Sequence, residues 1–286
     1  MSHPTLTARL AHVAVATWAV PPALLTKFLP PTSGPPLELD LYAKKPFLLP
    51  DGRPGAAISL VGVQRTHVRI YGTRWPYLRR HNSLALRICV RLVGAPGGAG
   101  RTGDAGQRGV VYIREVVSSR PIAWLLRRWY NHPCVCAPIE DEVKQQTLLI
   151  GSEYRVLWPD GGMAPGTHVQ KHMRLTEQTL RVVGRKPPTR DGDEAAPERW
   201  VTERPFVFGM DRAGRPLVHE VIHPGWSEYP AVDTMVRADM ASIFGWDFGF
   251  LSTQPPVHAV LAAGGEAAMF PATDAAGVRW GVKRKK

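Results

Sequence analysis

Residues 108–131 read RGVVYIREVVSSRPIAWLLRRWYN, a strand pattern followed directly by a helix pattern. β-branched and aromatic residues fill 109–117, as is typical of strands. The next segment predicts a helix over 121–130, with Ser119 as its N-cap. Four apolar residues of this helix recur at helical spacing and would lie on one face: Ile122, Leu125, Leu126 and Trp129. A strand that runs straight into a short amphipathic helix is therefore the clearest local structure in the chain.

On both sides of this stretch, Pro and Gly clusters divide the chain into short pieces with the Val, Ile, Thr and aromatic bias of strands. Two further short helices are predicted, at 21–28 and 239–244. We predict a mainly β protein with a few helices. The expected strands are 11–18, 37–43, 56–71, 84–93, 109–117, 134–139, 147–157, 168–174, 178–184, 199–209, 217–223 and 226–232.

Length and composition indicate a globular protein with a sizeable core. The chain has 286 residues, of which 44% are hydrophobic and 21% charged, far from the composition of disordered chains. We expect a single domain over 1–282, followed by a basic C-terminal tail, Lys283 to Lys286. No apolar run approaches the ~20 residues that a membrane-spanning helix needs, so no membrane span is expected.

The chain has three cysteines, Cys89, Cys134 and Cys136, which are too few for a disulfide framework. Two of them form a C-x-C pair rather than a redox C-x-x-C motif. No second Cys or His pair follows at zinc-finger spacing. We therefore expect buried free thiols, a reducing cytoplasm as the location, and neither a metal nor a cofactor.

The formal net charge is +12, which would admit nucleic acid, an anionic lipid surface or an acidic small molecule as partners. Apart from the last four residues, the basic side chains are scattered, and no basic helix or aromatic and basic stripe occurs. We expect a solvated surface, a small-molecule ligand and no specific nucleic-acid partner; a homo-oligomer is compatible with the sequence.

The sequence His219-Glu220-Val221-Ile222-His223 matches the H-E-x-x-H pattern of zinc peptidases. That chemistry requires a helix, on which both imidazoles share one face. Pro216 and Pro224 flank the motif, and its apolar residues favour a strand, which would separate the two imidazoles by about 13 Å. We predict a strand over 217–223 and keep a zinc peptidase only as a remote alternative.

Two carboxylates, Glu38 and Asp40, alternate with leucines in the segment LELDLY, so they would project from one face of a strand. A pair of carboxylates can serve acid–base chemistry. More often such a pair forms part of a solvated or salt-bridged face, and this is the interpretation that we favour.

Charged residues interrupt three strand-like segments. Arg87 lies inside LALRICV, Arg114 and Glu115 lie inside VVYIREVV, and Glu203 stands between Val201 and Phe206. A charge flanked by strand hydrophobics either faces solvent or lines a polar interior, where it is normally paired. For Arg87 we expect a polar interior, with Glu115 as the nearest candidate partner or an anionic ligand in its place.

Several segments, taken together, are similar to the family called domain of unknown function 2071, which belongs to the acetoacetate-decarboxylase-like superfamily. The resemblance covers most of the chain, and it rests on the order and spacing of the segments. The carriers are WAVPPALLTKFLP, PLELDLY, ISLVGVQRTHVRIYGTRWP, LALRICVR, RGVVYIREVVSSRPIAWLLRRWYN, WVTERPFVFG, VIHPGW and FLSTQPPVHAVLAAG.

The resemblance implies an antiparallel β-barrel or cone with a flanking sheet and a few helices. Acetoacetate decarboxylases form a Schiff base through a Lys, assisted by a second Lys and a Glu. The resemblance places the lysine pair after the helix, where this chain reads NHPCVCAPI, and the Glu near Ser83. No lysine occurs there, and Lys144 and Lys171 fall in no matching motif, so Schiff-base decarboxylation is not expected.

We therefore predict a small carboxylated or carbonyl-bearing ligand in the interior of the barrel, without a Schiff-base lysine. If the protein is an enzyme, Arg87 would clamp the substrate anion, and Glu115 or Glu203 would act as acid or base. Asn131 would orient a carbonyl, and the adjacent Tyr130 would contact the substrate. The alternative is a non-catalytic ligand-binding or regulatory module in which the same residues form structural ion pairs.

Overall fold

The computed structural model describes residues 3–31, 36–41, 47–93, 107–164, 167–170, 172–186, 197–223 and 225–274. Over these residues the chain is dominated by strands. The strands are β1 Leu6–Val20, β2 Leu37–Leu39, β3 Ala56–Ile70, β4 Thr73–Arg74, β5 Arg80–Leu92, β6 Gln107–Val117, β7 Cys134–Cys136, β8 Ile139–Gln145, β9 Leu149–Pro159, β10 Leu175–Arg185, β11 Phe206–Met210, β12 Pro216–Ile222, β13 Glu228–Arg237, β14 His258–Met269 and β15 Thr273–Asp274. The helices are α1 Pro22–Thr26, α2 Arg120–Tyr130, α3 Pro197–Thr202 and α4 Met240–Phe244, with 3-10 turns at Pro76–Leu78 and Trp246–Ser252.

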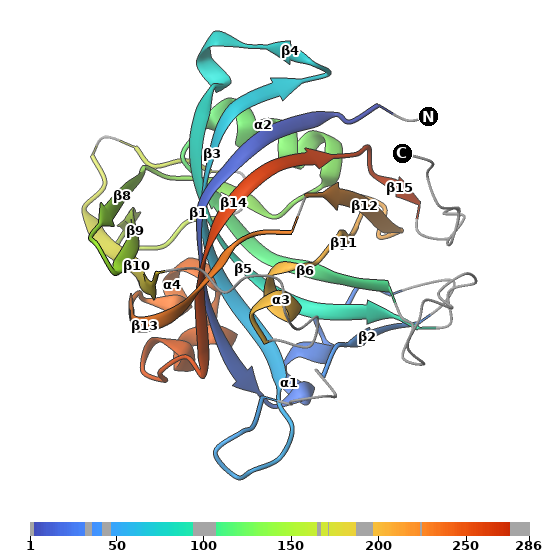
Figure 1. Ribbon diagram of the computed structural model, residues 1–286. Coiled ribbons are helices and arrows are strands. Elements are labelled where there is room, and N and C mark those ends of the chain that lie inside the picture. Colours follow the sequence, from blue (N-terminus) through green and yellow to red (C-terminus); the bar gives the residue numbers. More distant parts are fainter. Residues whose placement is uncertain are drawn as a thin grey trace.

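Seven of the strands close into a ring. Along the sheet the order is β12, β11, β6, β5, β3, β1 and β14, and a further pairing of β12 with β14 joins the two ends. Figure 1 shows β1, β3, β5 and β14 as long strands through the centre, with β11 and β12 to their right. Closure removes the exposed edges that an open sheet would leave, and it encloses an interior.

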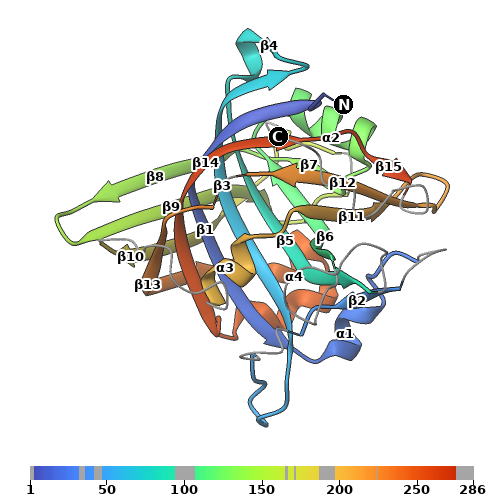
Figure 2. The ribbon, with the colours of Figure 1, turned by 45° about the vertical axis from the view of Figure 1, so that its right-hand side comes forward.

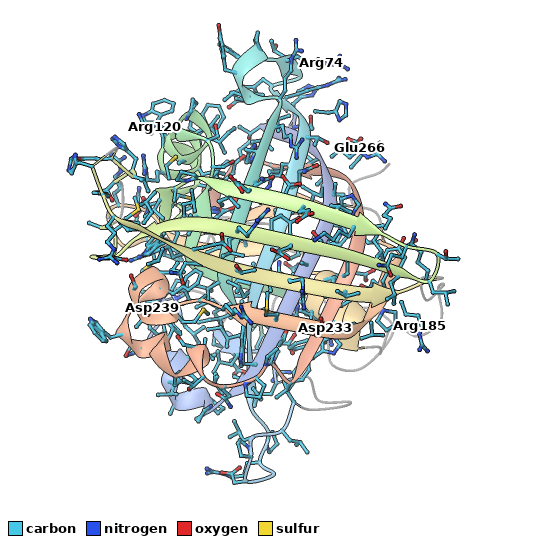
Figure 3. The ribbon with its side chains drawn as sticks, turned by 90° about the vertical axis from the view of Figure 1, so that its left-hand side faces the viewer. Arg74, Arg120, Arg185, Asp233, Asp239 and Glu266 are labelled. Atoms are coloured by element: carbon cyan, nitrogen blue, oxygen red, sulfur yellow. The ribbon has the colours of Figure 1, made fainter. Side chains whose placement is uncertain are left out.

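A flanking sheet continues from the ring beyond β14, in the order β13, β10, β9 and β8. In Figure 2 these strands extend to the left of the ring, and in Figure 3 they cross in front of its long strands, with Asp233 of β13 and Arg185 of β10 labelled. Buried residues from both layers form the largest apolar core, with Trp18 of β1 on one side and Trp158 of β9 on the other.

The flanking sheet lies close against the ring at Gly62 of β3. A Cβ atom at this position would overlap the ring of Tyr154 on β9. The Tyr154 hydroxyl donates a hydrogen bond to the His12 carbonyl oxygen, 2.6 Å away on β1. Glycine at position 62 therefore permits the contact between the two layers.

Two helical segments lie at different parts of the ring. Helix α2 packs through Ile122, Leu125 and Leu126 on a cluster that includes Leu6 of β1. Helix α3 belongs to a second cluster, in which Trp200 and Val201 contact apolar side chains of the ring strands. Residues of both clusters line a cavity inside the ring, which is the site described below.

The mainly β prediction, the flanking sheet and the expected helices at 21–28, 121–130 and 239–244 are confirmed. Ser119 occupies the N-cap position of α2, but its side chain makes no capping hydrogen bond. Because β11 and β7 both pair with β6 in parallel, the sheet is mixed rather than antiparallel throughout.

Several strand predictions are wrong in part. Of the strand predicted at 168–174, the described residues contain only an isolated bridge at His168. The first part of 199–209 belongs to helix α3, because Pro197 opens a helical turn before the strand. The segment 134–139 is divided between β7 and β8, with Pro138 between them. Strand β14 is missing from the predicted strands, because the small residues of AVLAAGGEAA give a weak strand signal.

The predicted strand over 217–223 is confirmed as β12. No helix among the described residues combines the length and apolarity needed to cross a bilayer. The basic tail Lys283 to Lys286 and Lys171 lie outside the described residues.

Candidate functional site

A cavity of about 90 Å³ lies inside the ring of strands. Every strand of the ring contributes to its lining, and α2 contributes Ile122 and Leu126. Its walls are mainly apolar, with a small polar set. The polar and titratable residues that line it are Arg65, His81, Arg87, Tyr112, Glu115, His132, Thr202, Arg204, His219 and His223.

The alternation of side chains along strands explains why these residues meet. On β3, Val61, Val63 and Arg65 follow one another at a spacing of two and all line the cavity. On β6 the spacing changes, because Ile113 has no partner in the register with β5. This bulge lets both Tyr112 and Glu115 face the cavity, although they are three residues apart.

Glu115 is the centre of the polar set, and its side chain is only 2% exposed. One carboxylate oxygen, Oε1, lies 3.3 Å from Arg65 Nη2. The other, Oε2, lies 3.3 Å from His132 Nδ1 and 3.8 Å from Cys134 Sγ. Arg65 also donates through Nη1 to the Ser83 hydroxyl, so its head group is held from two sides. Glu115 is thus an ion-paired carboxylate, as a buried charge requires.

The surroundings of Glu115 keep it ionised. Burial by itself would raise its pKa, but the Arg65 guanidinium and the His132 imidazole outweigh burial and hold the pKa of Glu115 at about 2. At neutral pH the carboxylate carries a full negative charge and no proton to donate. It can therefore stabilise positive charge or bind a cation, but it is not a general acid there.

Two histidines of the lining, His81 and His219, are neutral at pH 7. Burial, reinforced by the nearby Arg65, lowers the pKa of His81 to about 3. Burial also lowers the pKa of His219 well below its ordinary value. His219 lies beside His132, with ring centroids 5.1 Å apart, and its ring also packs on Tyr130. Neither His81 nor His219 adds positive charge to the cavity at neutral pH.

Arg87 lines the cavity from β5 and is partly buried. Its Nη2 donates to the Val201 carbonyl oxygen at 2.8 Å, and its buried Nε has no hydrogen-bond partner. The expected pairing with Glu115 is wrong, because Arg65 and His132 occupy that carboxylate. Among the described residues no carboxylate forms a salt bridge with Arg87, so its charge is open to the cavity.

The third lining guanidinium, Arg204, is already neutralised. Arg204 Nη1 lies 2.5 Å from Asp40 Oδ2, and both side chains are buried. Its Cζ lies 4.0 Å from the centre of the Trp200 ring, a cation–π arrangement. Glu38, the second carboxylate of LELDLY, pairs with Arg91 at 3.2 Å. The salt-bridged interpretation of Glu38 and Asp40 is confirmed.

The other residues predicted for the site lie further from its centre. Tyr130 is buried at the end of α2, and burial raises its pKa to about 12. It lines a neighbouring groove rather than the cavity. Asn131 is exposed, with a left-handed φ of 49° that ends α2, and its side chain donates to the Met210 carbonyl oxygen. Glu203 is exposed and does not line the cavity, whereas its neighbours Thr202 and Arg204 do.

No lysine occurs among the described residues that line the cavity. Lys144 is exposed on β8 and lies 3.3 Å from Glu142. The segment after α2, where the family resemblance places the lysine pair, contributes His132 to the cavity wall and Cys134 behind it.

The H-E-x-x-H sequence lies on strand β12, not on a helix. His219 is buried and His223 follows the end of the strand, and both line the cavity. The geometry that a helical zinc-peptidase motif requires is therefore missing, although the two histidines belong to the cavity wall.

Sequence reasoning missed Arg65, His132 and Cys134, which surround Glu115. It also missed four further polar residues of the lining, His81, Tyr112, Thr202 and Arg204. Arg65 could have been found from Val61 and Val63, because an arginine at the next same-face position interrupts a buried apolar row. His132 and Cys134 gave no such signal, since they become neighbours of Glu115 only through the parallel pairing of β7 with β6.

Comparisons with known proteins agree with this architecture. The model of the family described as DUF2071, an uncharacterized conserved protein, matches residues 7–264. No curated protein matches the chain. Three similar solved structures show the fold that the chain shares. The enduracididine biosynthesis enzyme MppR complexed with pyruvate has a TM-score of 0.55 and 12% sequence identity, over 96% of this chain and 91% of that one. The acetoacetate decarboxylase of Legionella pneumophila has a TM-score of 0.54 and 10% identity, over 96% of this chain and 89% of that one. An acetoacetate-decarboxylase-like enzyme from Sphingomonas wittichii has a TM-score of 0.54 and 13% identity, over 95% of this chain and 94% of that one.

At 10–13% identity these likenesses show the fold alone, whereas the family match extends over nearly the whole chain. The closed ring, the flanking sheet and the family match therefore lead to one conclusion: the chain belongs to the DUF2071 family and has the acetoacetate-decarboxylase-like fold.

Proposed function

We propose that this protein binds a small carboxylated or carbonyl-bearing molecule in the cavity of the ring, without forming a Schiff base. The observation that carries the proposal is the unpaired charge of Arg87. Its guanidinium lines the cavity, and no carboxylate among the described residues pairs with it. A buried or half-buried guanidinium cannot lose its charge, so an anionic ligand is the natural partner.

The charges of the other lining groups support an anion. Arg65 is compensated by Glu115, and Arg204 is compensated by Asp40. His81 is neutral at pH 7, because burial and Arg65 lower its pKa to about 3. Of the three guanidiniums that line the cavity, only that of Arg87 forms no salt bridge with a described carboxylate.

The size of the cavity, about 90 Å³, suits a small molecule of several non-hydrogen atoms. Apolar side chains such as Val63 and Leu126 line much of the wall and suit a short carbon chain beside the carboxylate.

The absence of lysine from the described lining argues against covalent capture of a carbonyl group. MppR, which shares the fold, has been solved with pyruvate. Pyruvate is therefore a suitable probe, because it carries both a carboxylate and a carbonyl group in a small molecule.

Whether the bound molecule is transformed depends on the groups opposite Arg87. Glu115, with its pKa held at about 2, is a weak base. The perturbed pKa values of Glu115 and His81 favour an enzyme, because they place an ionised and a neutral group beside the same cavity. The Arg65–Glu115 and Arg204–Asp40 ion pairs favour the alternative, a non-catalytic ligand-binding module, because these charges already have partners within the protein.

Thermal unfolding of the full-length protein with pyruvate or with acetone tests the binding. The expected result is a saturable rise of Tm with pyruvate and none with acetone, which lacks the carboxylate. An equal rise with both compounds would contradict an anion site.

Two further measurements complete the test. Borohydride reduction in the presence of pyruvate should add no mass to the intact protein, and a covalent adduct would refute the non-covalent mode. NMR of the incubated pyruvate separates the two classes, because an enzyme consumes its substrate and a binding module returns it unchanged. A binder of pyruvate that leaves it unchanged still supports the proposed ligand class.

A cytoplasmic location, a single domain over 1–282 and a homo-oligomer are further proposals. The three cysteines, Cys89, Cys134 and Cys136, are buried and free, which suits a reducing compartment. Light scattering of the purified protein measures its oligomeric state directly.

A further inference from the structure

We propose that Glu115, His132 and Cys134 form a binding site for a divalent cation of the zinc class, open to the cavity. Their ligand atoms, a carboxylate oxygen, an imidazole nitrogen and the thiol sulfur, all lie within 4.8 Å of one another. All three residues are buried.

The separations of these atoms fit ligands around one ion. From Glu115 Oε2, His132 Nδ1 lies 3.3 Å away and Cys134 Sγ lies 3.8 Å away. Bonds of ~2.0–2.3 Å to a tetrahedral zinc ion place its ligands roughly 3.3–3.7 Å apart. An ordinary N–H···O hydrogen bond is shorter, at about 2.7–3.2 Å. His132 and Cys134 make long hydrogen bonds to the same Oε2 atom, so the three ligand atoms already converge.

The backbone holds the three ligands in place. Glu115 and Cys134 stand opposite each other in the parallel pairing of β6 with β7. The Glu115 amide donates to the Pro133 carbonyl oxygen at 3.1 Å, which fixes the link between His132 and Cys134. The left-handed turn at Asn131 ends α2 directly before this link. The sheet, rather than a mobile loop, thus positions the site.

Arg65 leaves one carboxylate oxygen free for the ion. Its guanidinium lies beside Oε1 of Glu115, whereas the two other ligands gather around Oε2. A ligating carboxylate is commonly held by such a partner on its second oxygen. One carboxylate and one thiolate would give the ion two anionic ligands.

The donor set selects the type of metal. Thiolate and imidazole favour zinc and related transition metals over magnesium and calcium, which prefer oxygen ligands. Three protein ligands with a fourth, open position are typical of catalytic rather than structural zinc sites. Glu115 and His132 both line the cavity, so the fourth position faces it.

Cobalt(II) binding to the metal-free, reduced full-length protein tests the site, because cobalt reports its own ligands. We expect one Co²⁺ per chain, with a near-ultraviolet thiolate-to-cobalt charge-transfer band and visible bands of a tetrahedral ion. Zn²⁺ should displace the cobalt. Cys134→Ser should abolish the charge-transfer band, and the matched control Cys136→Ser, two residues along β7, should retain it.

His132→Gln provides a second variant should Cys134→Ser fail to fold by circular dichroism. Loss of a ligand should weaken Co²⁺ binding by at least the roughly tenfold that loss of a hydrogen-bond partner of a ligand costs. Substoichiometric binding, a charge-transfer band that Cys136→Ser removes as fully as Cys134→Ser, or wild-type affinity in His132→Gln would each overturn the proposal. The result is independent of the ligand proposed for Arg87, which contributes no atom to the cluster.

Discussion

The Arg65 guanidinium lies 3.3 Å from the Glu115 carboxylate across the wall of the cavity, and the two side chains are 15% and 2% exposed. The pair joins β3 to β6, which are not neighbours in the sheet, because β5 runs between them. It therefore ties together three strands of the ring, with the Ser83 hydroxyl on β5 as a further partner of Arg65.

Removing the cation from this pair should destabilise the protein strongly. Arg65→Gln leaves Glu115 buried without its main counter-charge, and breaking a buried ion pair on one side costs about 3–5 kcal/mol. The pKa of Glu115 should rise as well, since Arg65 is the largest of the influences that lower it. Urea unfolding measures the first effect, and NMR titration of the carboxyl carbon measures the second.

The matched control is Arg69→Gln, at an exposed position further along β3. A substitution there should change the free energy of unfolding by no more than ~0.5 kcal/mol. Equal losses in the two variants would show that the charge of the strand, rather than the buried pair, supports the fold.

His81 should make the folded protein less stable at mildly acidic pH. Its pKa falls from 6.5 to about 3 on folding, because of burial and Arg65. Between these two values the unfolded chain binds a proton that the folded chain does not, so stability falls with decreasing pH by up to ~1.4 kcal/mol per pH unit.

Urea unfolding at about pH 7 and pH 5 checks this dependence. His81→Gln should lose roughly 2 kcal/mol less than the wild type over this interval. The control His172→Gln, at an exposed position, should keep the wild-type dependence. If His81→Gln kept the wild-type pH dependence, the His81 imidazole would not be neutral in the folded protein.

The contact between the two layers predicts a cost for any side chain at Gly62. Gly62→Ala would push a methyl group into the Tyr154 ring, and overpacking of this kind costs typically ~1–3 kcal/mol. Gly209→Ala, on β11, has no heavy atom within 4 Å of the new methyl and should be tolerated. The difference in Tm between the two variants is the measurement, and equal Tm values would mean that the sheets can separate at no cost.

The sequence is informative wherever structure depends on local pattern. Helix α2 follows from the spacing of Ile122, Leu125 and Leu126, and strand β12 follows from the prolines around the H-E-x-x-H sequence. The lack of a lysine in the segment after α2 is likewise evident from the order of residues alone. These features depend on residues that are close together in the chain.

The site could not be predicted in the same way, because its contacts depend on register. Arg87 and Glu115 both face the cavity, and an unbulged pairing would make them diagonal neighbours. The bulge inserts Ile113 between their positions in the register, and Glu115 pairs instead with Arg65, a residue 50 positions earlier. No pattern in the sequence around Ile113 indicates that β6 contains an extra, unpaired residue.

The central claim is that the Arg87 guanidinium, which has no carboxylate partner among the described residues, binds a carboxylate in the cavity. Calorimetric titration of pyruvate into the wild type, Arg87→Gln and Arg91→Gln tests this claim most directly. Arg91 lies on the same strand but pairs with Glu38 away from the cavity. Loss of a charge-assisted hydrogen bond costs about 1.5–3 kcal/mol, so Arg87→Gln should bind pyruvate roughly 10- to 100-fold more weakly. Arg91→Gln should bind like the wild type. Unchanged affinity in Arg87→Gln, or the same loss in both variants, would contradict the assignment of the cavity as a carboxylate site.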